Sequence, residues 1–260
     1  MNNTKLELVS HVIRASLRHL STIACASLAF AVGGVALQAQ TLSVPNGSFE
    51  SPGTPPGFPA FPVVSLWQKT PQPPGFPLPS GYNWDQLAGV FPNTAFGQPD
   101  HIDNVDGAQA AYMLAIPGVS LFQEIGSPFQ VGKSYNLKLG ILGGGGITPG
   151  STFEMSLYYR DGANNLVSVA ATPITYSAAA FPNTTHLIDY EVTVPTVQSG
   201  NAWAGQTIGV QLTSTFGTGA GYWDVDSVRV QAVPEPASVA VLALGVGGLL
   251  VSRWRSRQQA

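Results

Sequence analysis

The chain has 260 residues, which is enough for one large or two small domains. Its formal net charge is −3, and 10% of its residues are aromatic. Between Gln40 and Val233 there are 12 acidic and 5 basic residues. Such an acidic surface argues against nucleic acid as a partner. The one cysteine, Cys25, lies near the N-terminus, so no disulfide is expected in the domain that follows.

Residues 1–39 have the pattern of a secretory signal peptide. Lys5, Arg14 and Arg18 precede an apolar segment, Leu20 to Leu37. This order of a basic start, an apolar stretch and small residues is typical of export, and it predicts cleavage after Ala39.

The domain after the leader is expected to begin with a short strand at 41–44, followed by a long proline-rich loop at 52–80. Ten prolines between Pro52 and Pro79 are incompatible with helix interiors and with central strands. Aromatic side chains near such a loop either pin it to the core or face a ligand. The candidates for stacking on a sugar ring are Trp67, Tyr82 and Trp84.

Beyond residue 110 the apolar residues alternate with polar ones. The clearest examples are the segments 134–141 and 152–159. Alternation with a period of two predicts half-buried antiparallel strands. Further strands are expected at 111–116, 120–125, 166–171, 187–194, 207–213 and 222–230. Residues 40–231 carry no helical pattern, so the sequence predicts an all-β sandwich.

In the last predicted strand the apolar residues change from odd-numbered to even-numbered positions. Trp223 and Val225 share one face, whereas Val228 and Val230 would share the other. An extra residue near Asp226 and Ser227 would restore a common face, so we expect a β-bulge there.

Four stretches of the domain resemble the galactose-binding-like jelly rolls found in carbohydrate-binding modules and DUF642-type wall proteins. They are 46–50 (NGSFE), 106–112 (DGAQAAY), 120–125 with 132–137, and 223–230 (WDVDSVRV). The resemblance implies an antiparallel jelly-roll sandwich in which residues 52–80 are an insertion. It also implies a structural Ca²⁺ held by Glu50 and Asp226, where the first and last strands meet. Calcium takes six to eight oxygens, so backbone carbonyls and water would complete the site, and two hydrogen-bonded or exposed acids are the alternative.

Known catalytic motifs do not occur in the domain. There is no G-x-S-x-G and no H-E-x-x-H, and Gly143–Gly146 lead into a proline and a glycine rather than a phosphate-binding helix. Asp100, Asp103 and Asp106 are interpreted as a solvated loop. No catalytic residue is predicted, although a pair such as Glu124 and Glu154 would suit a glycosidase.

The C-terminal residues 232–260 combine three features in a fixed order. These are the tripeptide Pro234, Glu235 and Pro236, an apolar segment 237–252 that predicts a transmembrane helix, and the basic residues Arg253, Arg255 and Arg257. A helix of that length covers about 24 Å, somewhat less than a bilayer core. The arginines predict a cytoplasmic end, which leaves the domain outside.

This order resembles the PEP-CTERM sorting signal of Gram-negative bacteria. The resemblance implies export, transient anchoring in the inner membrane, and processing by an exosortase. We therefore expect an exported, non-enzymatic jelly-roll protein that binds carbohydrate or exopolysaccharide at the cell surface or in the extracellular matrix. Its partners would be the secretion machinery, the exosortase, the membrane and polysaccharide. A purely structural surface protein and a carbohydrate-active enzyme are the alternatives.

Overall fold

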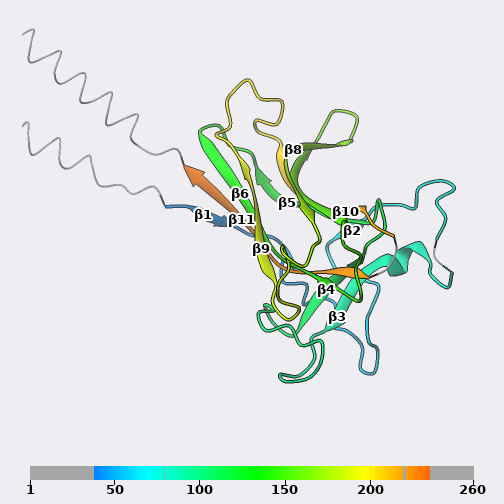
Figure 1. The fold of residues 1–260 in the computed structure, drawn as a ribbon. Helices are drawn as coiled ribbons and strands as arrows, with labels where there is room; N and C mark the ends of the chain where they lie inside the picture. Colours follow the sequence, from blue (N-terminus) through cyan, green and yellow to red (C-terminus); the bar gives the residue numbers. More distant parts are fainter. Residues whose placement is uncertain (1–37, 79, 219–220, 235–260) are drawn as a thin grey trace, which may run out of the picture. The chain divides into compact units, whose positions relative to one another are not determined.

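The computed structural model describes residues 38–78, 80–218 and 221–234, and this part of the chain folds as two antiparallel β-sheets (Figure 1). The first sheet has the order β3 (Ala88–Pro92), β4 (Gln109–Leu114), β11 (Tyr222–Pro234), β6 (Lys133–Gly144) and β9 (Ile188–Val194), with β1 (Gln40–Leu42) paired to β11. The second has the order β2 (Gln68–Lys69), β5 (Ser120–Pro128), β10 (Thr207–Phe216), β7 (Thr152–Arg160) and β8 (Leu166–Thr175). The prediction of an all-β fold with antiparallel sheets is confirmed.

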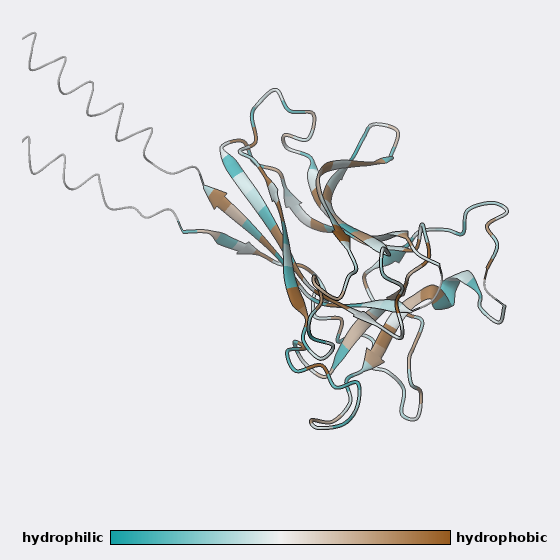
Figure 2. Ribbon diagram, viewed as in Figure 1, coloured by the Kyte–Doolittle hydropathy of each residue, from teal (hydrophilic) through white to brown (hydrophobic). Residues whose placement is uncertain are grey.

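The core lies between the two sheets. Leu137, Leu139 and Ile141 on β6 and Phe153 and Met155 on β7 are fully buried, as their alternation with polar residues predicted. In Figure 2, strands of both sheets carry brown, hydrophobic stretches. The Trp223 ring on β11 lies 5.4 Å from the Phe153 ring on β7, which joins the sheets. Each large side chain buried in this way contributes about 1.5–3 kcal/mol to folding.

Successive strands mostly alternate between the sheets. From β4 onward the chain passes to β5 in the second sheet, returns as β6, runs through β7 and β8, and returns again as β9. Most neighbours within a sheet are therefore not consecutive in the chain, as in a jelly-roll sandwich, and the exceptions are β3 with β4 and β7 with β8. The sequence did not predict β2 or β3, which have only two and five residues.

The predicted bulge in β11 is confirmed. The pairing of β11 with β6 shifts between Asp226 and Arg229, and Ser227 has a φ of 57°. The Val228 amide donates to the Gly47 carbonyl at 2.9 Å, so the first loop is fixed to the bulge. A Cβ on Gly47 would lie 2.7 Å from the Val228 carbonyl oxygen, which excludes any larger residue there.

The proline-rich segment 52–80 is held by specific contacts. Phe61 forms a β-bridge with Val90. The Lys69 ammonium donates to the backbone carbonyls of Pro62, Asp85 and Ala88 at 2.6–2.7 Å. This one side chain therefore connects β2 to the 3₁₀ helix η1 (Trp84–Leu87) and to β3.

The predicted leader and sorting tail, residues 1–37 and 235–260, lie outside the described residues. Within the described ranges, no helix has the length and apolar character needed to cross a membrane. The described part belongs to one compact unit, Ala39–Glu235, and its first and last strands pair, with Gln40 opposite Ala232.

Candidate functional site

The outer face of the first sheet carries the main candidate site. Trp223 and Val225 on β11 point into the core, so Tyr222 and Asp224 point to the opposite face. Asp224 lies between Tyr112 on β4 and Leu142 on β6. Because β11 is the middle strand of the sheet, Asp224 lies away from both sheet edges.

Two adjacent cavities open on this face. The larger has a volume of about 600 Å³ and contains Asp224 and Asp100 in its wall. The smaller, of about 460 Å³, is lined by tyrosines and by prolines of the segment 52–80. Pro59, Phe91 and Tyr222 line both cavities and form the ridge between them. We call the pair of cavities the Asp224 cleft.

The glycine run after β6 allows this cleft to form. A Cβ on Gly144 would come within 2.5 Å of the Tyr222 ring and 2.8 Å of Asp224 Oδ2. Gly145 has a φ of 58° and would also clash with Tyr222 if it carried a Cβ. The run that the sequence indicated only as a loop thus lets the β6 backbone approach Tyr222 and Asp224 closely.

Asp224 is the most unusual group in the cleft. It is 5% exposed, and within the described part of the chain its Oδ1 has no hydrogen-bond partner. Burial raises the pKa of Asp224 well above its usual range, and the nearby Asp100 carboxylate raises it further. Both effects favour the neutral, protonated acid, which can donate a hydrogen bond to a ligand.

The phenols around Asp224 also stay neutral. Burial raises the pKa of Tyr112 to about 12, and its hydroxyl donates to the Gln86 carbonyl at 3.1 Å. Burial likewise raises the pKa of Tyr222, with added contributions from Asp224 and Asp100. The cleft therefore presents aromatic rings and neutral hydrogen-bonding groups side by side.

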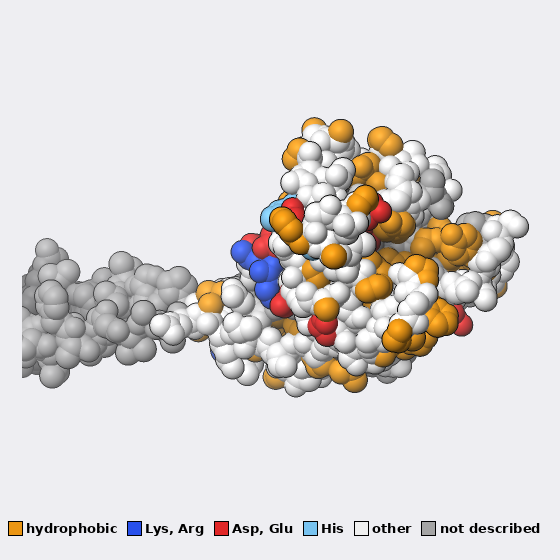
Figure 3. Space-filling model, turned by 90° about the horizontal axis from the view of Figure 1, so that it is seen from below, with side chains coloured by type: hydrophobic (Ala, Val, Ile, Leu, Met, Phe, Trp, Pro, Cys, Tyr) orange, Lys and Arg blue, Asp and Glu red, His pale blue; other side chains and the backbone are white. Residues whose placement is uncertain are grey.

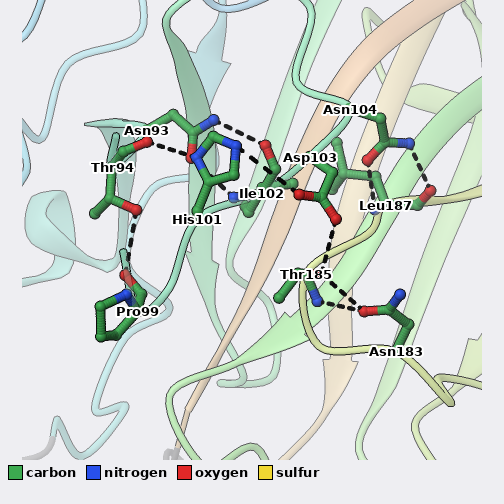
Figure 4. A network of polar contacts seen from close by, with 10 residues as sticks. All are labelled: Asn93, Thr94, Pro99, His101, Ile102, Asp103, Asn104, Asn183, Thr185 and Leu187. Atoms are coloured by element: carbon green, nitrogen blue, oxygen red, sulfur yellow. Dashed lines mark hydrogen bonds and ion pairs between the residues drawn. The ribbon is translucent and has the colours of Figure 1, made fainter. Parts of the chain in front are cut away.

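One wall of the larger cavity is the loop 93–104, which is held by its own side chains (Figure 4). The Asn93 side chain donates from its Nδ2 to the Ile102 carbonyl at 2.9 Å, and its Oδ1 accepts from the Ile102 backbone amide at 3.0 Å. His101 Nδ1 lies 2.6 Å from the Thr94 carbonyl oxygen. These contacts join the two ends of the loop, and Asp100 lies in the segment between them.

The same loop is joined to the segment 183–187, which supplies Thr184 to the cavity. The Asn104 amide group donates to the Leu187 carbonyl and accepts from the Leu187 amide, at 2.9 and 2.8 Å. The Asp103 carboxylate accepts from the Thr185 hydroxyl at 2.9 Å. The interpretation of Asp100, Asp103 and Asp106 as one solvated loop is therefore incomplete, because Asp100 lines the cavity and Asp103 holds its wall.

The two predicted calcium ligands lie in one neighbourhood, and Asp226 is two residues after Asp224 on β11. Asp226 is fully buried, and its Oδ2 accepts from the Asp106 amide at 2.6 Å. Glu50 Oε1 accepts from the amides of Ala108 and Gln109 at 3.0 Å each. Burial raises the pKa of Asp226 to about 7, and the Asp106 and Glu50 carboxylates add to this.

Asp226 Oδ1 is buried without a hydrogen-bond partner among the described residues, which suits a cation ligand. Clusters of three or more His, Cys, Asp or Glu side chains able to hold a metal ion are absent from the described ranges. A calcium site here would therefore depend on Glu50, Asp226 and backbone carbonyls, and it remains a prediction.

The predicted sugar-stacking platform is wrong for both tryptophans. Trp67 and Trp84 are 6% and 8% exposed. Trp67 packs on Phe49 and donates to the Asn46 carbonyl, and Trp84 packs on Phe76 and donates to the Thr70 carbonyl. Both rings therefore pin the proline-rich loop. Tyr82 is 49% exposed and lines the smaller cavity.

The sequence did not single out Tyr112, Tyr222 or Asp224. The available signal was the position of Asp224 in the strand pattern. This polar residue lies between two core residues, Trp223 and Val225, and so faces away from the core. The acid pair considered for a glycosidase, Glu124 and Glu154, lies on the second sheet and not in the cleft. Glu124 forms an ion pair with Arg160, and Arg160 and Glu154 are both on β7.

No protein-family model matches the sequence, and no curated protein is similar to it. Solved structures do match. The apo form of a cyclase from Fischerella sp. is 20% identical, with a TM-score of 0.58 over 76% of this chain and 98% of the other. A cyclase from Fischerella sp. TAU in complex with 4-(1H-indol-3-yl)butan-2-one is 19% identical, with a TM-score of 0.57 over 76% and 99%. At this identity the likeness shows a shared fold.

The prediction that this chain is not an enzyme is contradicted by these structures. The cyclases are enzymes, and their fold extends over three quarters of this chain. A jelly-roll domain without a known catalytic motif therefore does not indicate a non-catalytic protein.

Proposed function

We propose that this protein binds a carbohydrate in the Asp224 cleft, with Asp224 as the group that donates to the bound sugar. One observation carries the proposal. A nearly fully buried carboxyl group with an unpartnered oxygen lines a cavity of about 600 Å³ next to aromatic rings. An unpaired buried acid is costly unless a ligand or a catalytic role uses it.

The shape and chemistry of the cleft support a sugar. Its two cavities lie within the range of about 300–1,000 Å³ that is usual for small-molecule sites. Tyr222 and Phe91 offer aromatic rings for the C–H face of a pyranose, and the ridge they form would separate two neighbouring sugar units. The neutral Asp224 and the phenols would pair with hydroxyl groups.

Acid catalysis on the bound glycan is the second candidate. A protonated carboxyl group in an apolar site is suited to general-acid chemistry. Asp224 would give its proton to the glycosidic oxygen as the bond from that oxygen to the anomeric carbon breaks. Asp100 would take a proton from a water molecule whose oxygen adds to the anomeric carbon. Support comes from two carboxyl groups on one cavity and from the fold shared with enzymes.

We also propose that the protein is exported and sorted to the cell surface or extracellular matrix of a Gram-negative bacterium. The leader pattern at 1–39 and the Pro-Glu-Pro, apolar and arginine pattern at 232–260 support this. An exosortase would be the processing partner.

The test compares Asp224→Asn with Asp224→Ala by calorimetric titration of an oligosaccharide panel and by product analysis. The asparagine keeps the shape and a donor but cannot transfer a proton. If Asp224 only binds, Asp224→Asn should retain most of the affinity. If Asp224 is also an acid, Asp224→Asn should bind the glycan without cleaving it. Wild-type protein that binds no member of the panel would contradict the proposal.

A further inference from the structure

The titratable acids and bases that line the larger cavity include two carboxyl groups and no basic side chain among the described residues. Asp100 and Asp224 line it, and no lysine, arginine or histidine among the described residues does so. The acidic groups there are not part of any ion pair within the described ranges, whereas Asp189 and Glu191 on β9 of the same sheet are paired. Asp100 thus lacks the counter-charge that a bound ligand could bring.

Three of the basic side chains of the domain are held elsewhere. Lys138 pairs with Glu191 and Arg229 with Asp189 on the outer face of the first sheet, and Lys69 is bound by three carbonyls. In Figure 3 the basic side chains in view lie beside acidic ones. None of these cations can be redirected to the cleft without breaking an existing contact.

Asp100 is placed to receive a charged group. It is exposed on the cavity side of a loop that the Asn93 contacts close, and its φ of 64° is a left-handed conformation. Asp100, Asp224 and Tyr222 all line the larger cavity. A cation bound between Asp100 and the Tyr222 ring would have an ion pair and an aromatic face together.

Resting on the proposed carbohydrate function, we infer that the cleft selects amino sugars whose nitrogen is a free ammonium, as in de-N-acetylated glucosamine polymers. Asp100 is the residue that sets this specificity. The unpartnered Asp224 in the same cavity is the second, independent sign of a ligand, since its carboxyl group would pair with the same amine or with a neighbouring hydroxyl. Uronic acids would be excluded by repulsion, and an acetylated nitrogen would bring no charge.

The experiment uses two probes of equal length that differ only in the nitrogen, a glucosamine tetrasaccharide and an N-acetylglucosamine tetrasaccharide. Calorimetric titration is done at low salt and at a pH where the amine is protonated. A hydrogen-bonded ion pair predicts that wild-type protein binds the glucosamine probe about tenfold or more tightly than the acetylated one. Added salt should reduce that ratio.

Asp100→Asn is the diagnostic variant, because asparagine has the same shape and tolerates a left-handed backbone. It should bring the affinity for the glucosamine probe down to that for the acetylated probe. Glu154→Gln, with the same change of charge on the second sheet, is the matched control and should keep the wild-type preference. Equal binding of both probes by wild-type protein would overturn the inference and leave the carbohydrate function standing. No binding of either probe, with binding of another neutral glycan, would also overturn it, and no binding of any glycan would instead refute the proposed function.

Discussion

Single residues in this protein have roles that their chemical type alone does not reveal. Asp224 and Asp226 are two positions apart on one strand and on the same face, and each has an oxygen without a partner among the described residues. Loops cover Asp224 and leave it beside a cavity, whereas the bulge places Asp226 against the loop of Glu50 and Asp106. Two similar acids therefore support a ligand cleft and a candidate cation site.

Lys69 offers a stability prediction at this scale. Replacing it with methionine keeps most of the unbranched side chain but leaves three carbonyl groups without their charged donor. We expect a loss of roughly 3 kcal/mol in the free energy of unfolding, measured by denaturant titration. Lys133→Met, at a lysine without these three contacts, is the control, and an equal effect of both substitutions would contradict the role given to Lys69.

The aromatic residues of the proline-rich segment should divide into two groups. Trp67→Ala and Trp84→Ala should each lower the free energy of unfolding by about 3–5 kcal/mol, because both rings are buried. Tyr82→Ala should leave the melting temperature nearly unchanged and weaken carbohydrate binding. The melting temperature and the carbohydrate affinity, measured on the same three variants, distinguish the two groups. Unchanged melting of both tryptophan variants would return those rings to the list of ligand contacts.

At the scale of elements, much of the sandwich could be predicted from sequence, and the cleft could not. Alternation identified β6 and β7, and the parity change at Asp226 identified the bulge, because both are local properties of one strand. β3 is short and pairs with β4, some twenty residues away. The cleft depends on the contact between Asn104 and Leu187, which are 83 residues apart, and no local pattern records such a contact.

The junction of the first loop and the β11 bulge gives a pH prediction. An unfolded chain releases the Asp226 proton near 3.8, whereas burial raises the folded pKa to about 7. Between these values the folded state binds more protons, so in the presence of a chelator stability should fall as pH rises through this window. Asp226→Asn should reduce that dependence in thermal melts across the pH range, and the part due to Asp224, whose pKa burial also raises, should remain.

The same junction tests the proposed calcium. Calcium binds the ionised carboxylates, so added Ca²⁺ should raise the melting temperature most above about pH 7. The increase should be absent in Asp226→Asn and reduced in Glu50→Gln. Equal melting of wild-type protein with calcium and with chelator would remove the metal from this account.

At the scale of the whole molecule, the sorting proposal predicts how the chain is processed. Substituting Glu235 or deleting residues 253–257 should leave the protein full-length and associated with membranes, because processing near the Pro-Glu-Pro sequence would fail. Immunoblots of cell fractions measure this, with wild-type protein as the control. A mature wild-type protein whose mass still includes Arg257 would contradict processing at that motif.

The pairing of β1 with β11 has a mechanical consequence. β11 runs from Tyr222 in the cleft through the bulge at 226–229 to Pro234, about 40 Å at a strand's usual rise, and β1 is paired beside its far end. With the tail held in a membrane and a polymer held at Asp224, tension between them would pass along this one strand. Its hydrogen bonds to β4 and β6 lie across the direction of pull, so they would be loaded in shear and together, not opened one by one. The strand that carries the acid would then also be the part of the domain best able to resist being pulled out.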